Sequence, residues 1–350
     1  MKVVHVVEAW KGGIASYVQA LIDYQTSQGF EVVLIADSAE LKADDRALGI
    51  EVINYSSSRN PLRCLQISSW LADVIKKIKP DVLHCHSTFP GLYIRLRRHS
   101  CKVIYTPHGW SFFKKDVGFF SRFIYKSVER FLSFRCSRNV CMSLEEVRAA
   151  QDIGIPESSL ALVYTGIPDV SSVPTSSHHA SAADGPIKIG FFGRFDYQKG
   201  FDLVEKASAL VDSSVEIHVF GGAVREAPGS ISPHLIYHGW LNHRDIHENM
   251  LKMDAVLIPS RWEGFALTPL EAMRAGRPVI ISNLTSLPEV VVHGFNGLIM
   301  SEYNAAGLAK ILKSLTKEEC CRMGRNARMV YEQSFTFDKF SNEMDLVYQG

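Results

Sequence analysis

The N-terminal part of the chain has short apolar runs on either side of an amphipathic segment. Residues 2–7 read KVVHVV, a β-branched run typical of a buried strand. Apolar residues then recur at helical spacing over residues 12–29, GGIASYVQALIDYQTSQG, and Gly29 predicts the end of that helix. Residues 30–37, FEVVLIAD, predict the next strand. A strand, a helix and a strand in this order predict a βαβ unit and therefore a parallel sheet.

The same order of elements begins again near residue 187. There the pattern predicts a strand at 187–193, a helix at 200–211 and a strand at 215–222. Further elements are predicted elsewhere: strands at 81–86, 101–106 and 254–260 and a helix at 335–350. Residues 169–185 are rich in Ser, Ala and Pro, which is typical of a linker.

These elements predict an α/β protein with two Rossmann-like, doubly wound parallel sheets. One domain would span residues 1–168 and the other residues 186–334. Ligands of such sheets bind at the carboxyl ends of the strands. Two domains facing each other would therefore enclose a central cleft for a ligand.

Composition fits this architecture and narrows the function. The chain has 350 residues, enough for about two domains, and 46% of them are hydrophobic. The net charge of +1 does not indicate a nucleic-acid partner. Residues 1–170 carry a net +4 and the remainder a net −3, which suggests different partners for the two halves. Seven scattered cysteines without a CxxC pair fit reduced thiols, and we expect a cytoplasmic protein without a signal peptide or membrane span.

Glycines and cations follow the first strand of each predicted domain. Gly12 and Gly13 open the first helix, where they form either a tight turn or an approach for an anion to the helix amides. In the second domain, residues 193–200 read GRFDYQKG. Arg194 and Lys199 in this loop could hold a diphosphate, the first as a fork and the second as a point charge. The alternative is two solvated loop charges.

Two glutamates, Glu263 and Glu271, stand eight positions apart, with seven residues between them, in the segment EGFALTPLEAMRAGRPVI, residues 263–280. Glu263 follows a predicted strand and lies among apolar residues, where a carboxylate is costly unless it is paired. Thr268 and Glu271 have the spacing of a capping box, which gives Glu271 a structural role. The same carboxylate could also accept hydrogen bonds from two vicinal hydroxyl groups, as on a ribose.

Five segments together resemble the retaining GT-B glycosyltransferases of family 4. The segment with the two glutamates resembles the Glu-x7-Glu signature of that family, and FFGRFDYQKGFDLVEKA resembles its diphosphate loop. The other three are WKGGIASYVQALIDYQTSQGFEV, YTPHG and LPEVVVHGFNGL, in the family's order. TGI at residues 165–167 departs from the usual Asn-Gly-Val/Ile, so no role is carried over for that Asn.

The resemblance implies a donor site for a nucleotide-diphosphate sugar, with a UDP-sugar as the leading candidate and no cofactor. Its residues would be Gly13, Gly193, Arg194, Lys199, Glu263, Gly264, Phe265, Ala266, Leu267 and Glu271. The resemblance assigns catalytic roles to Glu263, His108, Arg194 and Lys199, with the two cations on the diphosphate and His108 on the donor sugar. Glu271 would bind the ribose, and the last helix, 335–350, would cross back onto the first domain.

The chain contains no Asp-x-Asp, which argues against a metal clamp on the diphosphate. Fixed cations and helix amides would then stabilise the leaving nucleotide. Retention would follow from attack on the face that the nucleotide leaves, although the sequence does not separate this route from a covalent intermediate on Glu263.

His84 and His86 share one face of a strand, but two ligands do not make a metal site, so we expect packing or acceptor contact there. His243 and His247 lack the glutamate of HExxH, which favours a surface helix.

Residues 110–138 alternate aromatic and basic side chains, with seven Phe and a Trp among the cations. The cations are Lys114, Lys115, Arg122, Lys126, Arg130, Arg135 and Arg138, and Arg95, Arg97 and Arg98 would extend their patch. An interfacial helix buries its aromatics at the lipid boundary and sets its cations on anionic headgroups, so we expect contact with an anionic membrane surface. The alternative is a core-packed helix with a solvated basic face. The residues expected to face the membrane or the acceptor are Gly12, His86, Lys114, Lys115, Arg122 and Lys126.

The sequence therefore predicts a retaining, metal-independent glycosyltransferase at the cytoplasmic face of a membrane. Its acceptor would be a glycan linked to a polyprenyl diphosphate, as in the biosynthesis of capsule or lipopolysaccharide. Two alternatives remain open at this point. One is a nucleotide-sugar 2-epimerase of the same architecture, and the other is an inactive subunit that binds a partner transferase.

Overall fold

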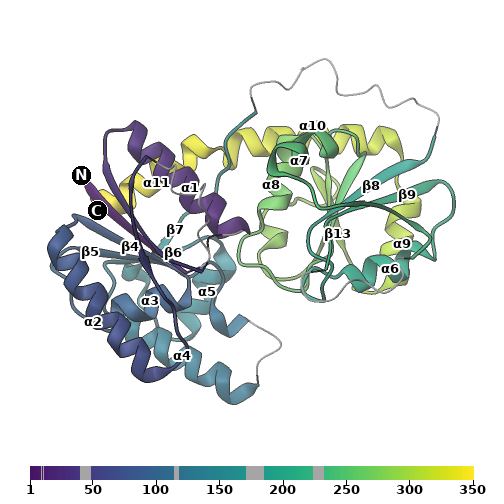
Figure 1. The fold of residues 1–350 in the computed structure, drawn as a ribbon. Coiled ribbons are helices and arrows are strands. Elements are labelled where there is room, and N and C mark those ends of the chain that lie inside the picture. The colour runs from purple at the N-terminus through teal and green to yellow at the C-terminus, as the bar shows by residue number, and fades with distance from the viewer. Residues whose placement is uncertain (9, 11, 40–48, 114–117, 171–184, 224–231) are drawn as a thin grey trace. The chain divides into compact units, whose positions relative to one another are not determined.

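A computed structural model of the chain forms two compact units (Figure 1). The structure describes all residues except 9, 11, 40–48, 114–117, 171–184 and 224–231. For residues 243 and 244 it describes the backbone but not the side chains. The first unit comprises Met1–Thr165 and Phe340–Gly350, and the second comprises Gly166–Lys339. Most of the predicted linker, like Lys114 and Lys115, lies outside the described residues.

The first unit is built on a parallel sheet with the strand order β3-β2-β1-β4-β5-β6-β7. The strands are β1 (Lys2–Val7), β2 (Glu31–Asp37), β3 (Glu51–Tyr55), β4 (Val82–His86), β5 (Lys102–Thr106), β6 (Arg138–Cys141) and β7 (Leu160–Leu162). The strands predicted from short apolar runs in this part of the chain are confirmed. The strand order reverses between β1 and β4, so ligands are expected at the carboxyl ends of these two strands.

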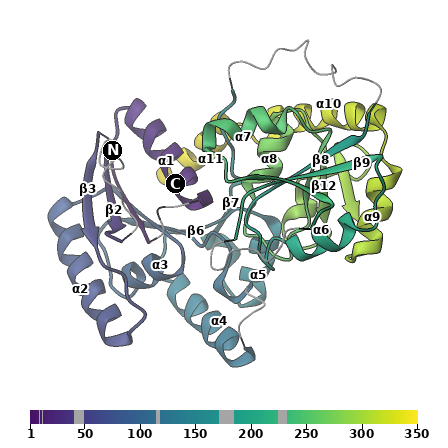
Figure 2. The same cartoon turned by 45° about the vertical axis from the view of Figure 1, so that its right-hand side comes forward.

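Helices cover both faces of this sheet, with α1 beside α11 on one face and α2 to α5 on the other (Figures 1 and 2). They are α1 (Gly12–Ser27), α2 (Pro61–Ile78), α3 (Thr88–Arg95), α4 (Phe119–Ser133), α5 (Leu144–Asp152) and α11 (Phe337–Gln349). The Tyr24 hydroxyl donates to Asp345 at 2.6 Å and thereby ties α1 to α11. Most of the last helix thus belongs to the first unit. Its buried residues are Phe340, Ser341, Met344 and Tyr348, whereas Leu346 is 68% exposed.

The second unit has a parallel sheet with the order β10-β9-β8-β11-β12-β13. Its strands are β8 (Ile187–Phe192), β9 (Val215–Phe220), β10 (Leu235–Gly239), β11 (Ala255–Ile258), β12 (Val279–Ser282) and β13 (Gly297–Met300). Its helices are α6 (Phe201–Ser208), α7 (His243–Met250), α8 (Leu267–Arg274), α9 (Ala305–Ser314) and α10 (Lys317–Ser334). The predicted α/β class with two parallel sheets is confirmed.

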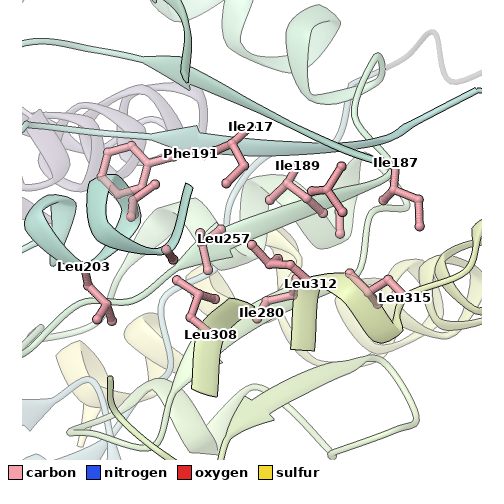
Figure 3. Packing of buried hydrophobic residues seen from close by; sticks show 14 of the residues in the cluster. Ile187, Ile189, Phe191, Leu203, Ile217, Leu257, Ile280, Leu308, Leu312 and Leu315 are labelled. Carbon is pink, nitrogen blue, oxygen red and sulfur yellow. The ribbon is translucent and has the colours of Figure 1, made fainter. Parts of the chain in front are cut away.

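Figure 3 shows the packing that positions the second sheet. Ile189 and Leu257 project from β8 and β11 onto Leu308 and Leu312 of α9, and all four are at most 1% exposed. Alternate residues of the strands point into this cluster, because successive side chains of a strand face opposite sides of the sheet. The two strands that lead to the predicted donor loops are thereby fixed side by side.

The segment 110–138 differs from the single helix that we expected. It contains a short 3-10 turn, Ser111–Phe113, and then α4, which begins only at Phe119. Trp110 and Phe112 are buried in the core of the first unit, whereas the Phe side chains of α4 are exposed and Tyr125 packs against that core. Among the described residues, no helix is both long enough and apolar enough to cross a bilayer.

Candidate functional site

The predicted donor loops follow neighbouring strands of the second sheet. β8 pairs with β11, and the strand order reverses between them, so their carboxyl ends form a switch point. Residues 193–200 follow β8, and residues 259–266 follow β11. The fold therefore brings Arg194, Lys199 and Glu263 to one edge of this sheet.

Lys199 and Glu263 form an ion pair that joins the two loops. Lys199 Nζ donates to Glu263 Oε1 at 2.6 Å, and the side chains are 21% and 9% exposed. The backbone N–H of Glu263 donates to the Thr285 hydroxyl at 3.2 Å. Lys199 thus supplies the partner that a buried carboxylate requires.

Arg194 stands in the same loop with a more open environment. Its guanidinium lies 3.1 Å from Asp196 Oδ2 and donates to Gln198 Oε1 at 2.9 Å. Gln198 Nε2 in turn donates to the carbonyl of Trp262 at 3.2 Å, which is a second link between the loops. The Arg194 side chain is 43% exposed, so its charge remains accessible to an anion.

The start of α8 differs from the predicted capping box. The helix begins at Leu267 with Ala266 as its N-cap, and no side chain caps it, so Thr268 lies inside the first turn. Glu271 therefore sits one turn further along and is only partly buried. The capping-box role that the sequence offered for Glu271 is wrong, because the N-cap is Ala266, two residues before Thr268. Residues 264–267 lead into this helix, where backbone amides favour an anion.

The first unit gathers four histidines near the carboxyl ends of β1, β4 and β5. His5 pairs in register with His84, so the rings of His5, His84 and His86 lie on one face of the sheet. His108 follows β5 with φ 53, an uncommon conformation for a residue other than glycine. Its ring contacts that of His86 at a centroid distance of 5.3 Å.

These rings are joined by hydrogen bonds. His5 Nδ1 lies 3.0 Å from His86 Nε2, and His86 Nδ1 lies 3.1 Å from His108 Nε2. The nitrogens of His84 contact the hydroxyl groups of Tyr348 at 2.7 Å and Thr106 at 2.8 Å. Burial lowers the pKa of His5 to about 4 and that of His108 to about 3, so both rings are neutral at pH 7.

His5, His84 and His86 offer nitrogen atoms within 4.8 Å of one another, close enough to be considered for a metal ion. The sequence pattern indicated only two of the three, because His5 lies on another strand, 79 residues before His84. Every ring nitrogen of the set already has a hydrogen-bond partner: Gln25 and His86 for His5, Tyr348 and Thr106 for His84, and His5 and His108 for His86. Hydrogen bonding therefore accounts for the cluster.

Several predicted positions need correction. His86 has no exposed surface, because α1 and α11 cover its face of the sheet, so it cannot contact an acceptor directly. Arg95 is 1% exposed and donates to the buried Glu129 at 2.8 Å, so it does not extend the basic patch. His247 is also buried, at 8% exposure, although we expected a surface helix.

Three other residues were expected to face the membrane or the acceptor. Lys126 is exposed, Arg122 is partly exposed, and Gly12 begins α1 with φ 61.

The two halves of the chain match two family models. Residues 11–170 match Glycosyltransferase Family 4, and residues 175–330 match Glycosyl transferases group 1. A 41.2 kDa protein of the cps region of Klebsiella pneumoniae is 29% identical over 92% of this chain and 94% of its own length. The Campylobacter jejuni N,N'-diacetylbacillosaminyl-diphospho-undecaprenol alpha-1,3-N-acetylgalactosaminyltransferase is 24% identical over 91% of this chain and 92% of its own.

A solved structure has the same fold as this chain. Alr3699/HepE of Anabaena, in complex with UDP and glucose, has a TM-score of 0.81 with 18% identity, over 100% of this chain and 99% of its own. The likeness extends through both parallel sheets. The fold, the two consecutive family matches and the relatives together identify the chain as a GT-B glycosyltransferase of the group 1 and family 4 type.

Proposed function

We propose that this glycosyltransferase moves a sugar from a nucleotide diphosphate to a lipid-linked glycan, with retention of the anomeric configuration, in surface polysaccharide biosynthesis. The observation that carries the proposal is the Lys199–Glu263 ion pair at the switch point of the second sheet, with Arg194 in the same loop. A UDP-sugar is the donor we propose, since the Anabaena protein of the same fold holds UDP and glucose. The second unit would bind this donor.

The reaction would rest on charges that are fixed before the substrate arrives. Arg194 and Lys199 would neutralise the diphosphate as it leaves, and the amides of residues 264–267 would add the dipoles of a helix N-terminus. Glu271 would accept hydrogen bonds from the ribose hydroxyl groups. Since the protein supplies these cations and dipoles itself, we propose a metal-independent reaction.

Glu263 would bind the donor sugar and would not attack it. One carboxylate oxygen of Glu263 already accepts a charge-assisted hydrogen bond from Lys199 at 2.6 Å, which lowers its nucleophilicity. The departing phosphate oxygen would instead take the proton of the acceptor hydroxyl. Attack on the face that the nucleotide leaves retains the configuration.

The first unit offers a surface suited to a lipid-linked acceptor. On α4 and just after it, Phe119, Phe120, Phe123, Phe131 and Phe134 are 87%, 73%, 60%, 68% and 67% exposed. Lys126 and Arg130 on the same helix are exposed as well. Exposed aromatics beside cations fit the interface of an anionic membrane. The Campylobacter relative is named for a diphospho-undecaprenol acceptor, which supports an acceptor of this class.

The test is a transfer assay with purified protein, a panel of UDP-sugars and a polyprenyl-diphosphate-linked monosaccharide in EDTA. Proton NMR of the product reports the configuration of the new anomeric centre. We expect UDP release that depends on the acceptor and a product with the configuration of the donor. An inverted product, or activity that returns only with Mg²⁺, would contradict the proposed mechanism.

A further inference from the structure

A continuous line of hydrogen bonds runs from Gln25 on α1 to His108 after β5. Gln25 Oε1 lies 2.8 Å from His5 Nε2, and the line continues through the His5–His86 contact at 3.0 Å to the His86–His108 contact at 3.1 Å. Gln25, His5 and His86 are fully buried, whereas His108 is partly exposed. The line therefore connects a buried carboxamide to a ring that reaches the surface of the first unit.

The chemistry of the two ends gives the line a direction. A neutral imidazole has one N–H donor and one bare acceptor nitrogen, and a carboxamide oxygen only accepts. His5 must therefore donate to Gln25 from Nε2, which leaves its Nδ1 bare. His86 then donates from Nε2 to His5, and His108 donates from Nε2 to His86. The free nitrogen of His108, Nδ1, is left as a bare acceptor.

The hydrogen bonds take this direction only if the rings are uncharged, and their environment keeps them uncharged. Burial lowers the pKa values of His5 and His108 to about 4 and about 3, and it lowers the pKa of His86 well below its ordinary range. Each ring at neutral pH then has a single proton to place. The opposite orientation of the Gln25 carboxamide would reverse every bond and put a proton on His108 Nδ1. Gln25 thus selects between two states of a ring that it does not touch.

We propose that Gln25 is a positioning residue that holds His108 in the Nε2–H tautomer, so that Nδ1 accepts a hydrogen bond from a sugar hydroxyl group. The identity of this ligand rests on the proposed function. A bare nitrogen is repelled by the lone pairs of a phosphate oxygen, so this tautomer selects a hydroxyl over the diphosphate.

Two further observations fit a ligand at His108. Its backbone has φ 53, a strained conformation of the kind that gathers at ligand sites. Its ring is held edge-on by Tyr17 at a centroid distance of 4.8 Å. In the part of the chain that the structure describes, no hydrogen bond to Nδ1 is found, so this nitrogen is available.

The first experiment reads the tautomers directly. Protein with ¹⁵N-labelled histidine is studied by long-range proton–nitrogen NMR at pH 7, with His5, His86 and His108 assigned by single substitution. The expected result is a protonated Nε2 and a bare Nδ1 in all three rings. Gln25→Leu removes the terminal acceptor, and we expect a second tautomer of His108 to appear. Gln19→Leu is the matched control, because Gln19 lies on the same helix but bonds to Asp23.

The second experiment measures binding of UDP and of the UDP-sugar that wild type binds most tightly. Loss of one hydrogen bond predicts that Gln25→Leu weakens UDP-sugar binding by about three- to tenfold. Binding of UDP alone should stay unchanged, since UDP lacks the sugar that is transferred. Gln19→Leu should bind both ligands as wild type does.

Each contrary outcome overturns a defined part of the inference. A protonated Nδ1 in wild-type His108, or unchanged tautomers in folded Gln25→Leu, would remove the role of Gln25. If the ring signals of His5 and His86 change when EDTA removes a bound metal, the rings form a metal site and the proposed line of hydrogen bonds is wrong. Absence of UDP-sugar binding by wild type would overturn the proposed function and the hydroxyl ligand, while the tautomers would still be decided by NMR.

Discussion

At the scale of single residues, the proposed donor site depends on a buried charge that has its partner. Glu263 lies deep enough to need a cation, and Lys199 supplies it from a loop 64 residues away in the sequence. Arg194 is far more exposed and is held by Asp196 and Gln198. The site therefore contains one cation that is already paired with a carboxylate and one that is more open to an incoming anion.

Lys199→Met tests whether Lys199 both neutralises Glu263 and binds the donor. The substitution leaves the carboxylate of Glu263 buried without its cation, which should lower the free energy of unfolding by about 1–3 kcal/mol. It should also weaken UDP binding at least about tenfold, since a charge-assisted hydrogen bond is worth about 1.5–3 kcal/mol. Lys206→Met is the control, because Lys206 is exposed on the neighbouring helix. Urea unfolding and calorimetry measure the two effects, and equal behaviour of both variants would refute the role of Lys199.

The buried histidines predict a pH dependence of stability. The pKa of His5 is lowered to about 4 in the folded protein, so between pH 6.5 and 4 the unfolded chain binds the proton and the folded chain does not. The free energy of unfolding should therefore fall as the pH drops through this window, by about 1.4 kcal/mol per pH unit for each such histidine.

Urea unfolding between pH 7 and 5 measures that slope. In a folded His5→Gln variant, this slope should be smaller than in wild type by about 1.4 kcal/mol per pH unit. His234→Gln, at an exposed position, should leave the slope as it is in wild type. A wild-type stability that does not change over this range would show that the histidines are not held neutral.

At the scale of elements, the loop between β8 and α6 is shaped by close backbone packing. Gly200 has φ 72, and a Cβ at this position would lie 2.2 Å from the carbonyl oxygen of Pro259. The loop after β8 therefore runs directly against the loop after β11. This contact, together with the Gln198–Trp262 hydrogen bond, holds Lys199 within reach of Glu263.

Gly200→Ala should therefore lower the free energy of unfolding by more than the positive φ alone would cause. Gly29 is the matched control, since its φ is 77 and a Cβ there would meet nothing within 4 Å. We expect Gly29→Ala to lower the free energy of unfolding by about 1–2 kcal/mol and Gly200→Ala to lower it by about 1–3 kcal/mol more. Chemical unfolding measures both, and equal losses would mean that the close approach to Pro259 is not present.

The exposed face of α4 predicts binding to anionic vesicles. Replacing Phe119, Phe120 and Phe123 with Ser removes three aromatics that are at least 60% exposed, so the fold should be kept. Co-sedimentation with phosphatidylglycerol vesicles should weaken at least about tenfold, because burial of each Phe at an interface contributes on the order of 1 kcal/mol. Leu62→Ser, at 72% exposure on α2, should bind as wild type. Equal binding of the triple variant and wild type, or no preference for anionic over zwitterionic vesicles, would exclude this face as the docking surface.

At the scale of the whole molecule, the periodic features of the sequence predicted the architecture. Buried parallel strands are short β-branched runs, so β1 and β8 were evident from KVVHVV and IKIGFF. The loop positions of Arg194 and Lys199 followed from the end of β8, and that of Glu263 followed from the end of β11. The ion pair itself was beyond the sequence, because it depends on the order of strands in the sheet.

The errors arose where tertiary packing decided between local alternatives. Thr268 has the spacing of a capping residue, yet α8 begins at Leu267. Trp110 and Phe119 belong to one aromatic segment, but one is 1% and the other 87% exposed. The bond between Gln25 and His5 joins a helix to a strand, and no local pattern marks it.

The most direct test of the donor site is calorimetric titration of the intact protein with UDP, GDP and ADP in EDTA. We predict that one of them, UDP, binds wild type without a metal ion and that Arg194→Ala and Glu271→Ala each weaken this binding at least about tenfold. Addition of Mg²⁺ should change the affinity little. If no nucleotide binds wild type, or if binding persists in both variants, the switch point of the second sheet is not the donor site.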